Sequence, residues 1–155
     1  MSFQITGLDA APFRRFYGLS DEALQSFGVK RLIADEKPGF PDRIELRDVE
    51  PGEALLLLNY LHQPADTPYK ASHAIFVREW AVTPYRAVGE VPEVLRIRPI
   101  SLRAFDDSGD MVDADLTGGD DLEPTIARLL AHPKAAYIHA HYARRGCYAA
   151  RIDQG

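Results

Sequence analysis

Cysteine is almost absent from this sequence: Cys147 is the only one, so no disulfide can form within the chain. A lone thiol suits a reducing compartment. The chain also lacks a basic segment followed by a long apolar stretch, and its longest apolar run, residues 54–58, is far shorter than the roughly 20 residues of a membrane-spanning helix. We therefore expect a cytoplasmic protein with neither a signal peptide nor a membrane partner.

Clustered positive charge is scarce as well. The formal net charge is -5 at pH 7, and the sequence pI is about 5.5. The two arginine pairs, Arg14-Arg15 and Arg144-Arg145, are too small to form the basic track that neutralises nucleic-acid phosphates. The sequence therefore predicts no nucleic-acid partner.

The composition is otherwise that of a globular protein. With 155 residues, of which 46% are hydrophobic and 26% charged, the chain can bury a core without help from a disulfide or a metal. It contains no internal repeat, low-complexity tract or linker. We expect one domain over residues 1–155.

Hydrophobic periodicity predicts short strands, separated by turns, and a few short helices. Strands are expected at residues 3–8, 29–34, 44–46, 54–60, 72–78, 100–105 and 111–116, and helices at residues 11–17, 20–27, 91–97 and 122–131. Ser20 is a suitable N-cap for the second helix, and Asp120 with Glu123 matches a capping box for the last one. The expected class is α+β: a mainly antiparallel, strongly bent sheet of about six to eight strands, with closure into a partial barrel left open, and two or three helices on one side.

The end of the chain concentrates the side chains that can do chemistry. Residues 135–153 read AAYIHAHYARRGCYAARID and alternate with a period of two on either side of residues 143–146, as an antiparallel hairpin does. Side chains two apart on a strand share one face, so His139 and His141 point the same way, about 7 Å apart. Both imidazoles can lean toward one ion at the roughly 2.1 Å distance that zinc prefers.

A metal site needs a third ligand. His62 and His73 each lie at the end of a predicted strand, and Cys147 could supply a thiolate if the fold brings it round. We take His73, His139 and His141 as the candidate metal ligands. A His-x-His pair with one remote histidine is typical of sites in which an open position activates water. The alternative is that these histidines only satisfy hydrogen bonds.

The register of the terminal hairpin decides where Cys147 points. A connection of two or four residues places Cys147 opposite Tyr142, on the apolar face that includes Ile138. A connection of three residues moves Cys147 to the face of His139 and His141, as a Cys/His nucleophile would require. The sequence leaves both registers open.

A second polar group surrounds the loop between predicted strands 54–60 and 72–78. If these two strands are neighbours, the group lines one rim of the sheet, where functional loops commonly lie. Joined to the terminal histidines, it forms a polar pocket able to orient a small ligand. The candidate ligand-binding residues are therefore Asn59, Tyr69, His73, His139 and His141. The alternative is that these side chains only pin a proline-rich loop.

Three blocks of sequence together resemble the domain-of-unknown-function family 1203. They are DEKPGFP at residues 35–41, LLLNYLHQPADTPYKASHAIFVRE at residues 56–79 and HAHYARRGCYAARID at residues 139–153. The resemblance covers essentially the whole chain and implies a small, single-domain bacterial protein. It supplies no catalytic residue, binding residue or cofactor.

Two functions stay open at this point. One is a domain, enzymatic or not, that binds a small molecule or a metal in the polar pocket. The other is an interaction or structural domain, acting as a homodimer, in which the same polar side chains only hold loops in place. The sequence identifies no substrate, reaction or cofactor.

Overall fold

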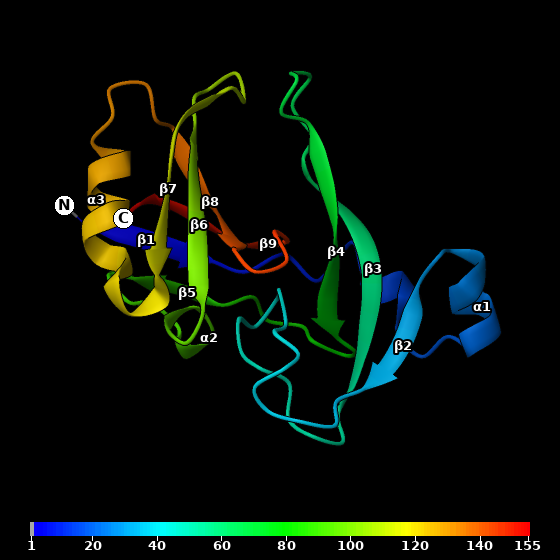
Figure 1. The fold of residues 1–155 in the computed structure, drawn as a ribbon. Coiled ribbons are helices and arrows are strands. Elements are labelled where there is room, and N and C mark those ends of the chain that lie inside the picture. Colours follow the sequence, from blue (N-terminus) through cyan, green and yellow to red (C-terminus); the bar gives the residue numbers. More distant parts are fainter. Residues whose placement is uncertain (1) are drawn as a thin grey trace.

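The computed structural model describes residues 2–155 and contains nine strands in two antiparallel sheets (Figure 1). The larger sheet has the order β5-β1-β9-β8-β6-β7 and the smaller sheet the order β2-β3-β4. The larger sheet comprises β1 (Phe3–Thr6), β5 (Arg86–Val88), β6 (Pro99–Phe105), β7 (Met111–Gly118), β8 (Tyr137–Tyr142) and β9 (Tyr148–Gln154). The smaller sheet comprises β2 (Lys30–Ile33), β3 (Ala54–Gln63) and β4 (Ala71–Arg78). The α+β class is confirmed, but the strands divide into two sheets, and those described close no barrel.

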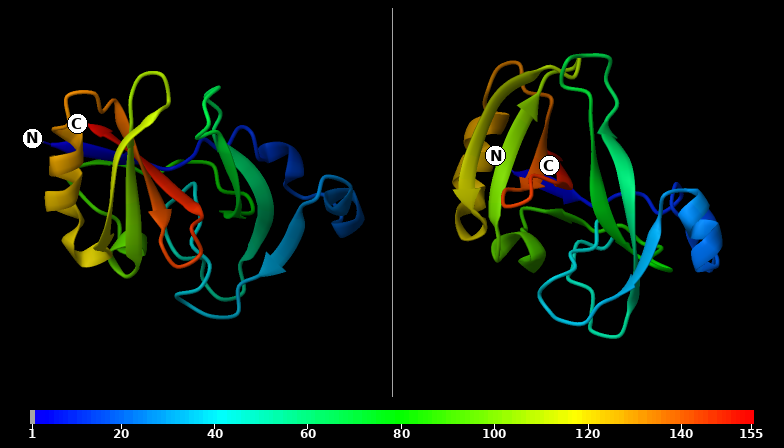
Figure 2. Two further views of the ribbon diagram at one scale, coloured as in Figure 1. Left: turned by 45° about the horizontal axis from the view of Figure 1, so that its top comes forward. Right: turned by 45° about the vertical axis from the view of Figure 1, so that its right-hand side comes forward.

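Three α-helices accompany the sheets in the described chain: α1 (Asp21–Ser26), α2 (Glu93–Arg96) and α3 (Leu122–Leu130). Two 3-10 turns, η1 (Arg14–Phe16) and η2 (Gly119–Asp121), add to them. Helix α3 covers the outer face of the larger sheet, whereas α1 lies beside β2 at the opposite end of the molecule (Figure 2). Helices α2 and α3 both pack into the core of the larger sheet, as expected for two helices on one side, and α1 packs beside the smaller sheet. No helix within residues 2–155 is both long and apolar enough to cross a membrane.

The caps of the two longer helices differ from each other. The Ser20 hydroxyl accepts a hydrogen bond from the Ala23 N–H at 3.1 Å, which confirms the predicted N-cap of α1. The predicted capping box of α3 is wrong, since the helix begins after Asp121 without a side-chain cap. Glu123 instead pairs with Arg96 of α2, because a nearby guanidinium is a stronger partner than a backbone N–H.

The predicted strand at residues 44–46 is wrong. Ile44 lies in a turn, and Leu46 has a φ of 51°. Both side chains are buried, Ile44 in the core beneath the smaller sheet and Leu46 in the core beneath the larger one. The alternation that predicts a strand here therefore reflects a loop that anchors its apolar residues in two different cores.

The two sheets face each other and touch at their hairpin tips, which lie at the top of Figure 1. The Thr67 hydroxyl, between β3 and β4, donates to the carbonyl of Gly109, between β6 and β7, at 3.2 Å. A Cβ on Gly109 would lie 2.3 Å from the Cβ of Ala65, so only glycine permits this approach. Below the tips, the Gln63 amide donates to the Tyr137 hydroxyl at 2.9 Å. These contacts hold the inner faces of the two sheets together.

Candidate functional site

Strand β8 carries the two histidines that the sequence singles out, and their shared face is confirmed. Ile138 and Ala140 point into the core between the larger sheet and α3. His139 and His141 point the other way, toward the smaller sheet, and pair in register with Arg103 and Ser101 of β6. Both faces of β8 are therefore largely buried. One packs among apolar side chains of the core, and the other among aromatic and histidine rings.

His62 reaches the same place from the smaller sheet. A ring nitrogen from each of His62, His139 and His141 lies within 4.8 Å of the others, and we call these three residues the histidine cluster. Their exposed fractions are only 8%, 4% and 0%. His62 is the extra residue of a β-bulge between Leu61 and Gln63. A bulge can re-aim a side chain, and here the bulged residue contacts the opposite sheet.

One nitrogen on each ring of the histidine cluster is buried without a hydrogen-bond partner among residues 2–155. These atoms are Nδ1 of His62, Nδ1 of His139 and Nε2 of His141. Nδ1 of His141 lies 2.9 Å from the carbonyl oxygen of Gly146. Because a carbonyl only accepts, this Nδ1 carries the proton and Nε2 keeps its lone pair. His141 therefore presents an acceptor to the interior.

His73 lies beside the histidine cluster, with its ring centre 4.6 Å from that of His62 and 5.4 Å from that of His141. Its Nδ1 is 2.6 Å from Nε2 of His62, and its ring is only half-buried. The structure thus brings His139 and His141 together with His62, the alternative third ligand, while His73 contacts His62. Asn59 and Tyr69 are both exposed, Asn59 on β3 and Tyr69 in the loop that follows. Both side chains are open to solvent, and a role for these two residues in ligand binding stays a prediction.

Burial keeps the histidine cluster uncharged at neutral pH. Loss of hydration lowers the pKa of His62 to about 4 and the pKa values of His139 and His141 to about 3. The charge of Arg103 lowers all three further, and Arg151 adds to this at His139. Neutral imidazole is the form that binds metals.

The aromatic ring of Tyr148 packs against all three residues of the histidine cluster. The Tyr148 ring lies parallel to His62 within 13°, with centroids 5.1 Å apart, and meets His139 edge-on at 5.0 Å. Tyr148 pairs with His141 in register because β9 has a bulge at Ala149. Sequence reasoning missed this tyrosine, since a bulge breaks the period-two pattern on which face assignments depend.

Cys147 does not join the histidine cluster, since the hairpin has the four-residue connection. The Tyr142 N–H donates to the Cys147 carbonyl at 2.9 Å, and the side chain packs against the core of the larger sheet. Its Sγ lies 3.1 Å from Nη2 of Arg43. Arg43 is 1% exposed and donates to the carbonyl oxygens of Pro41 and Tyr148. Nothing in the loop sequence around Arg43 indicated that this arginine would be buried.

The fold and the site together define an α+β protein with two facing antiparallel sheets and a buried set of histidines between them. Residues 39–154 match the family model described as "Protein of unknown function (DUF1203)", so the chain belongs to that family, as its sequence blocks indicated. The matched segment contains every residue of the histidine cluster. No curated protein and no solved structure matches the chain.

Proposed function

We propose that this protein binds a divalent transition-metal ion, with Zn²⁺ as the first choice, through the histidine cluster. The observation that carries the proposal is the convergence of three neutral imidazoles, with ring nitrogens within 4.8 Å, each having a buried nitrogen without a partner among residues 2–155. A buried polar atom left unpaired costs about 1–3 kcal/mol. An ion bound by all three rings would give such atoms a partner, and imidazole suits zinc, copper, nickel and iron.

The surroundings of the cluster support this proposal. A histidine that binds a metal commonly donates its other ring N–H to a fixed acceptor, which orients the ring. The Gly146 carbonyl accepts this hydrogen bond from His141, and His73 is in place to accept one from His62. We therefore assign His73 as a positioning residue and not as a ligand.

Three protein ligands leave one position of a tetrahedral ion open. Arg103 and Arg151 flank His139 on the neighbouring strands β6 and β9. Arg151 forms an ion pair with Asp153, so it is the charge of Arg103 that favours an anion or a polarised water molecule at the open position. A site of this composition resembles catalytic zinc sites more than structural ones, in which the protein supplies all four ligands.

Metal analysis of the protein, purified without a chelator or a histidine tag, tests the proposal. We expect about one equivalent of bound ion per chain and recovery of that stoichiometry when EDTA-stripped protein is titrated with ZnCl₂. The double variant His139→Ala, His141→Ala should lose it, whereas His132→Ala, which alters the one histidine away from the site, should retain it. His62→Gln, which keeps the bulk of the side chain, should also lose it. A stripped wild-type protein that takes up no ion would refute the proposal.

The same variants separate this proposal from the homodimeric interaction domain. If the histidines mediate homodimer formation, His139→Ala should change the molar mass measured by light scattering, and the wild-type protein should bind no Zn²⁺. Metal binding predicts the opposite result: an unchanged mass and a lost Zn²⁺ response.

A further inference from the structure

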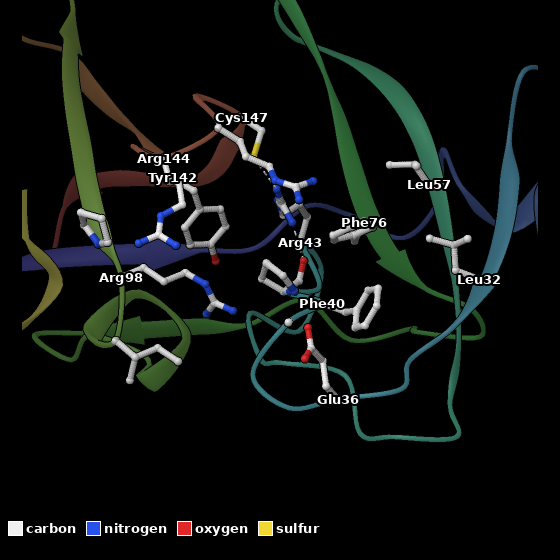
Figure 3. Close-up of a pocket in the computed structure, with 15 residues that line it drawn as sticks. Leu32, Glu36, Phe40, Arg43, Leu57, Phe76, Arg98, Tyr142, Arg144 and Cys147 are labelled. Atoms are coloured by element: carbon white, nitrogen blue, oxygen red, sulfur yellow. Dashed lines mark hydrogen bonds between the residues drawn. The ribbon is translucent and has the colours of Figure 1, made fainter.

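A cavity separate from the histidine cluster lies where the loop at residues 34–53 meets the connection between β8 and β9. Its volume is about 580 Å³ (Figure 3). Small-molecule sites generally have volumes of about 300–1,000 Å³. The cavity is therefore large enough to hold a ligand of small-metabolite size.

Positive charge dominates the lining of this cavity, in a chain whose formal net charge is -5. The cavity is lined by four arginines, Arg43, Arg98, Arg144 and Arg145. We call this cavity the arginine pocket. Glu36 is the one acidic residue among the lining residues, and it is exposed to solvent. Arg144 and Arg145 are exposed as well, and water screens exposed charges far more than buried ones. The positive charge of the pocket interior therefore comes from the buried Arg43.

Arg43 is the buried member of this set. Its hydrogen-bond partners are two carbonyl oxygens and the Cys147 thiol, with no carboxylate among them. A buried charge without a counter-charge is costly. Arg98, in contrast, is held by Asp48 at 2.6 and 3.1 Å. The charge of Arg43 is thus the one that an incoming anion would neutralise.

Tyr142 supplies an independent observation. Its side chain lines the pocket, it is only 5% exposed, and its hydroxyl has no hydrogen-bond partner among residues 2–155. The guanidinium carbons of Arg43 and Arg98 lie 4.9 and 5.3 Å from the centre of its ring, as Figure 3 illustrates. An unpaired buried hydroxyl, on a ring that contacts two guanidinium groups, is a hydrogen-bond donor that lacks an acceptor.

We propose that the arginine pocket binds a small organic anion. A carboxylate or phosphate group would bind against the arginines, since guanidinium groups bind both anions in a bidentate manner. It would also accept a hydrogen bond from the Tyr142 hydroxyl. The apolar part of the ligand would lie against Phe40 and Phe76, whose ring centres are 5.4 Å apart. This proposal goes beyond the metal site and does not depend on it.

A smaller cavity of about 180 Å³ lies beside the arginine pocket. It shares Arg43 and Cys147 with the arginine pocket, and it is also lined by His73. His73 in turn contacts His62 of the histidine cluster. His73 thus borders the smaller cavity on one side and His62 on the other.

Calorimetric titration of EDTA-stripped protein at low ionic strength tests the proposal without any contribution from metal. The probes are phenyl phosphate and benzoate, with benzyl alcohol as the neutral control that keeps the same ring. We expect at least one anionic probe to bind at least about tenfold more tightly than benzyl alcohol. Arg144→Ala, Arg145→Ala should weaken that binding about tenfold, and Tyr142→Phe should weaken it several-fold.

The matched control is Arg14→Ala, Arg15→Ala, which removes the same charge from another adjacent pair of exposed arginines. This control should bind the anionic probe as the wild type does. Equal affinity for the charged and neutral probes would overturn the proposal, as would no binding of either anion. An equal loss of affinity in the control would also overturn it, because the effect would then come from net charge alone.

Discussion

Nε2 of His62 lies 2.6 Å from Nδ1 of His73, and the two imidazole planes differ by only 5°. This contact joins the bulge of β3 to the neighbouring strand β4. When His62 donates the proton, its Nδ1 keeps a lone pair on the side of the histidine cluster. His73 can thus fix both the orientation and the tautomer of His62 without entering the cluster itself.

The first prediction separates ligand from positioning residue. His62→Ala should abolish stoichiometric Zn²⁺ binding, whereas His73→Ala should keep the stoichiometry and weaken the affinity about 10–100-fold, as loss of an orienting partner generally does. Competition titration against a chelating dye measures both variants. Asn59→Ala, an exposed change on the same strand as His62, serves as the control. Wild-type affinity in His73→Ala would contradict the positioning role.

The second prediction concerns the pH dependence of stability in the metal-free protein. Burial lowers the pKa of His62 to about 4 and those of His139 and His141 to about 3, whereas an unfolded histidine titrates near 6.5. Between these values the unfolded chain binds protons that the folded protein does not. The free energy of unfolding therefore falls as the pH drops, by about 3–4 kcal/mol for the three groups between pH 7.5 and pH 5.5.

Urea denaturation in EDTA at the two pH values measures this loss. The double variant His139→Phe, His141→Phe should lose about two thirds of the pH dependence that comes from the histidine cluster, because one of its three groups remains. The contribution of His73, whose pKa burial also lowers, remains in the variant. His132→Ala should retain all of the pH dependence. A stability that is the same at pH 7.5 and pH 5.5 in the wild type would be incompatible with three buried neutral histidines.

The third prediction concerns the contact between the sheets at Gln63 and Tyr137. Gln63 is 2% exposed, and its amide donates to the Tyr137 hydroxyl. Tyr137→Phe leaves that amide unpaired in the interior and should lower the free energy of unfolding by about 1–3 kcal/mol. Tyr69→Phe, at an exposed tyrosine, should change it by less than about 0.5 kcal/mol. Equal effects of the two changes in urea denaturation would argue against the contact.

The fourth prediction compares a buried and an exposed ion pair. The side chains of Asp48 and Arg98 are 6% and 19% exposed, whereas those of Asp113 and Arg128 are 36% and 52% exposed. Asp48→Ala should cost about 3 kcal/mol because it leaves Arg98 without its buried partner. Asp113→Ala should cost less than about 1 kcal/mol. Thermal and urea denaturation of both variants measure the difference, and a cost below 1 kcal/mol for Asp48→Ala would contradict the assigned burial.

Local patterns were sufficient for most of the secondary structure. The hairpin of β6 and β7 and the helix over residues 122–131 follow from periodicity and turn residues, to within a few residues. The sequence left open whether β3 pairs with β4, and the structure shows that it does. The same reasoning failed at residues 44–46, where two buried apolar side chains belong to different cores. Periodicity reports which residues are buried, and it cannot report which core receives them.

The sequence by itself determined that His139 and His141 share one face of a strand, because that face assignment depends only on the alternation of side chains along an extended chain. Only the tertiary structure decided that His62 is the third member of the cluster and that Arg43 is buried beside Cys147. His62 enters through a bulge, and Arg43 comes from a loop without regular structure. Neither position has a repeating local signal, since each is fixed by contacts between segments that are far apart in the chain.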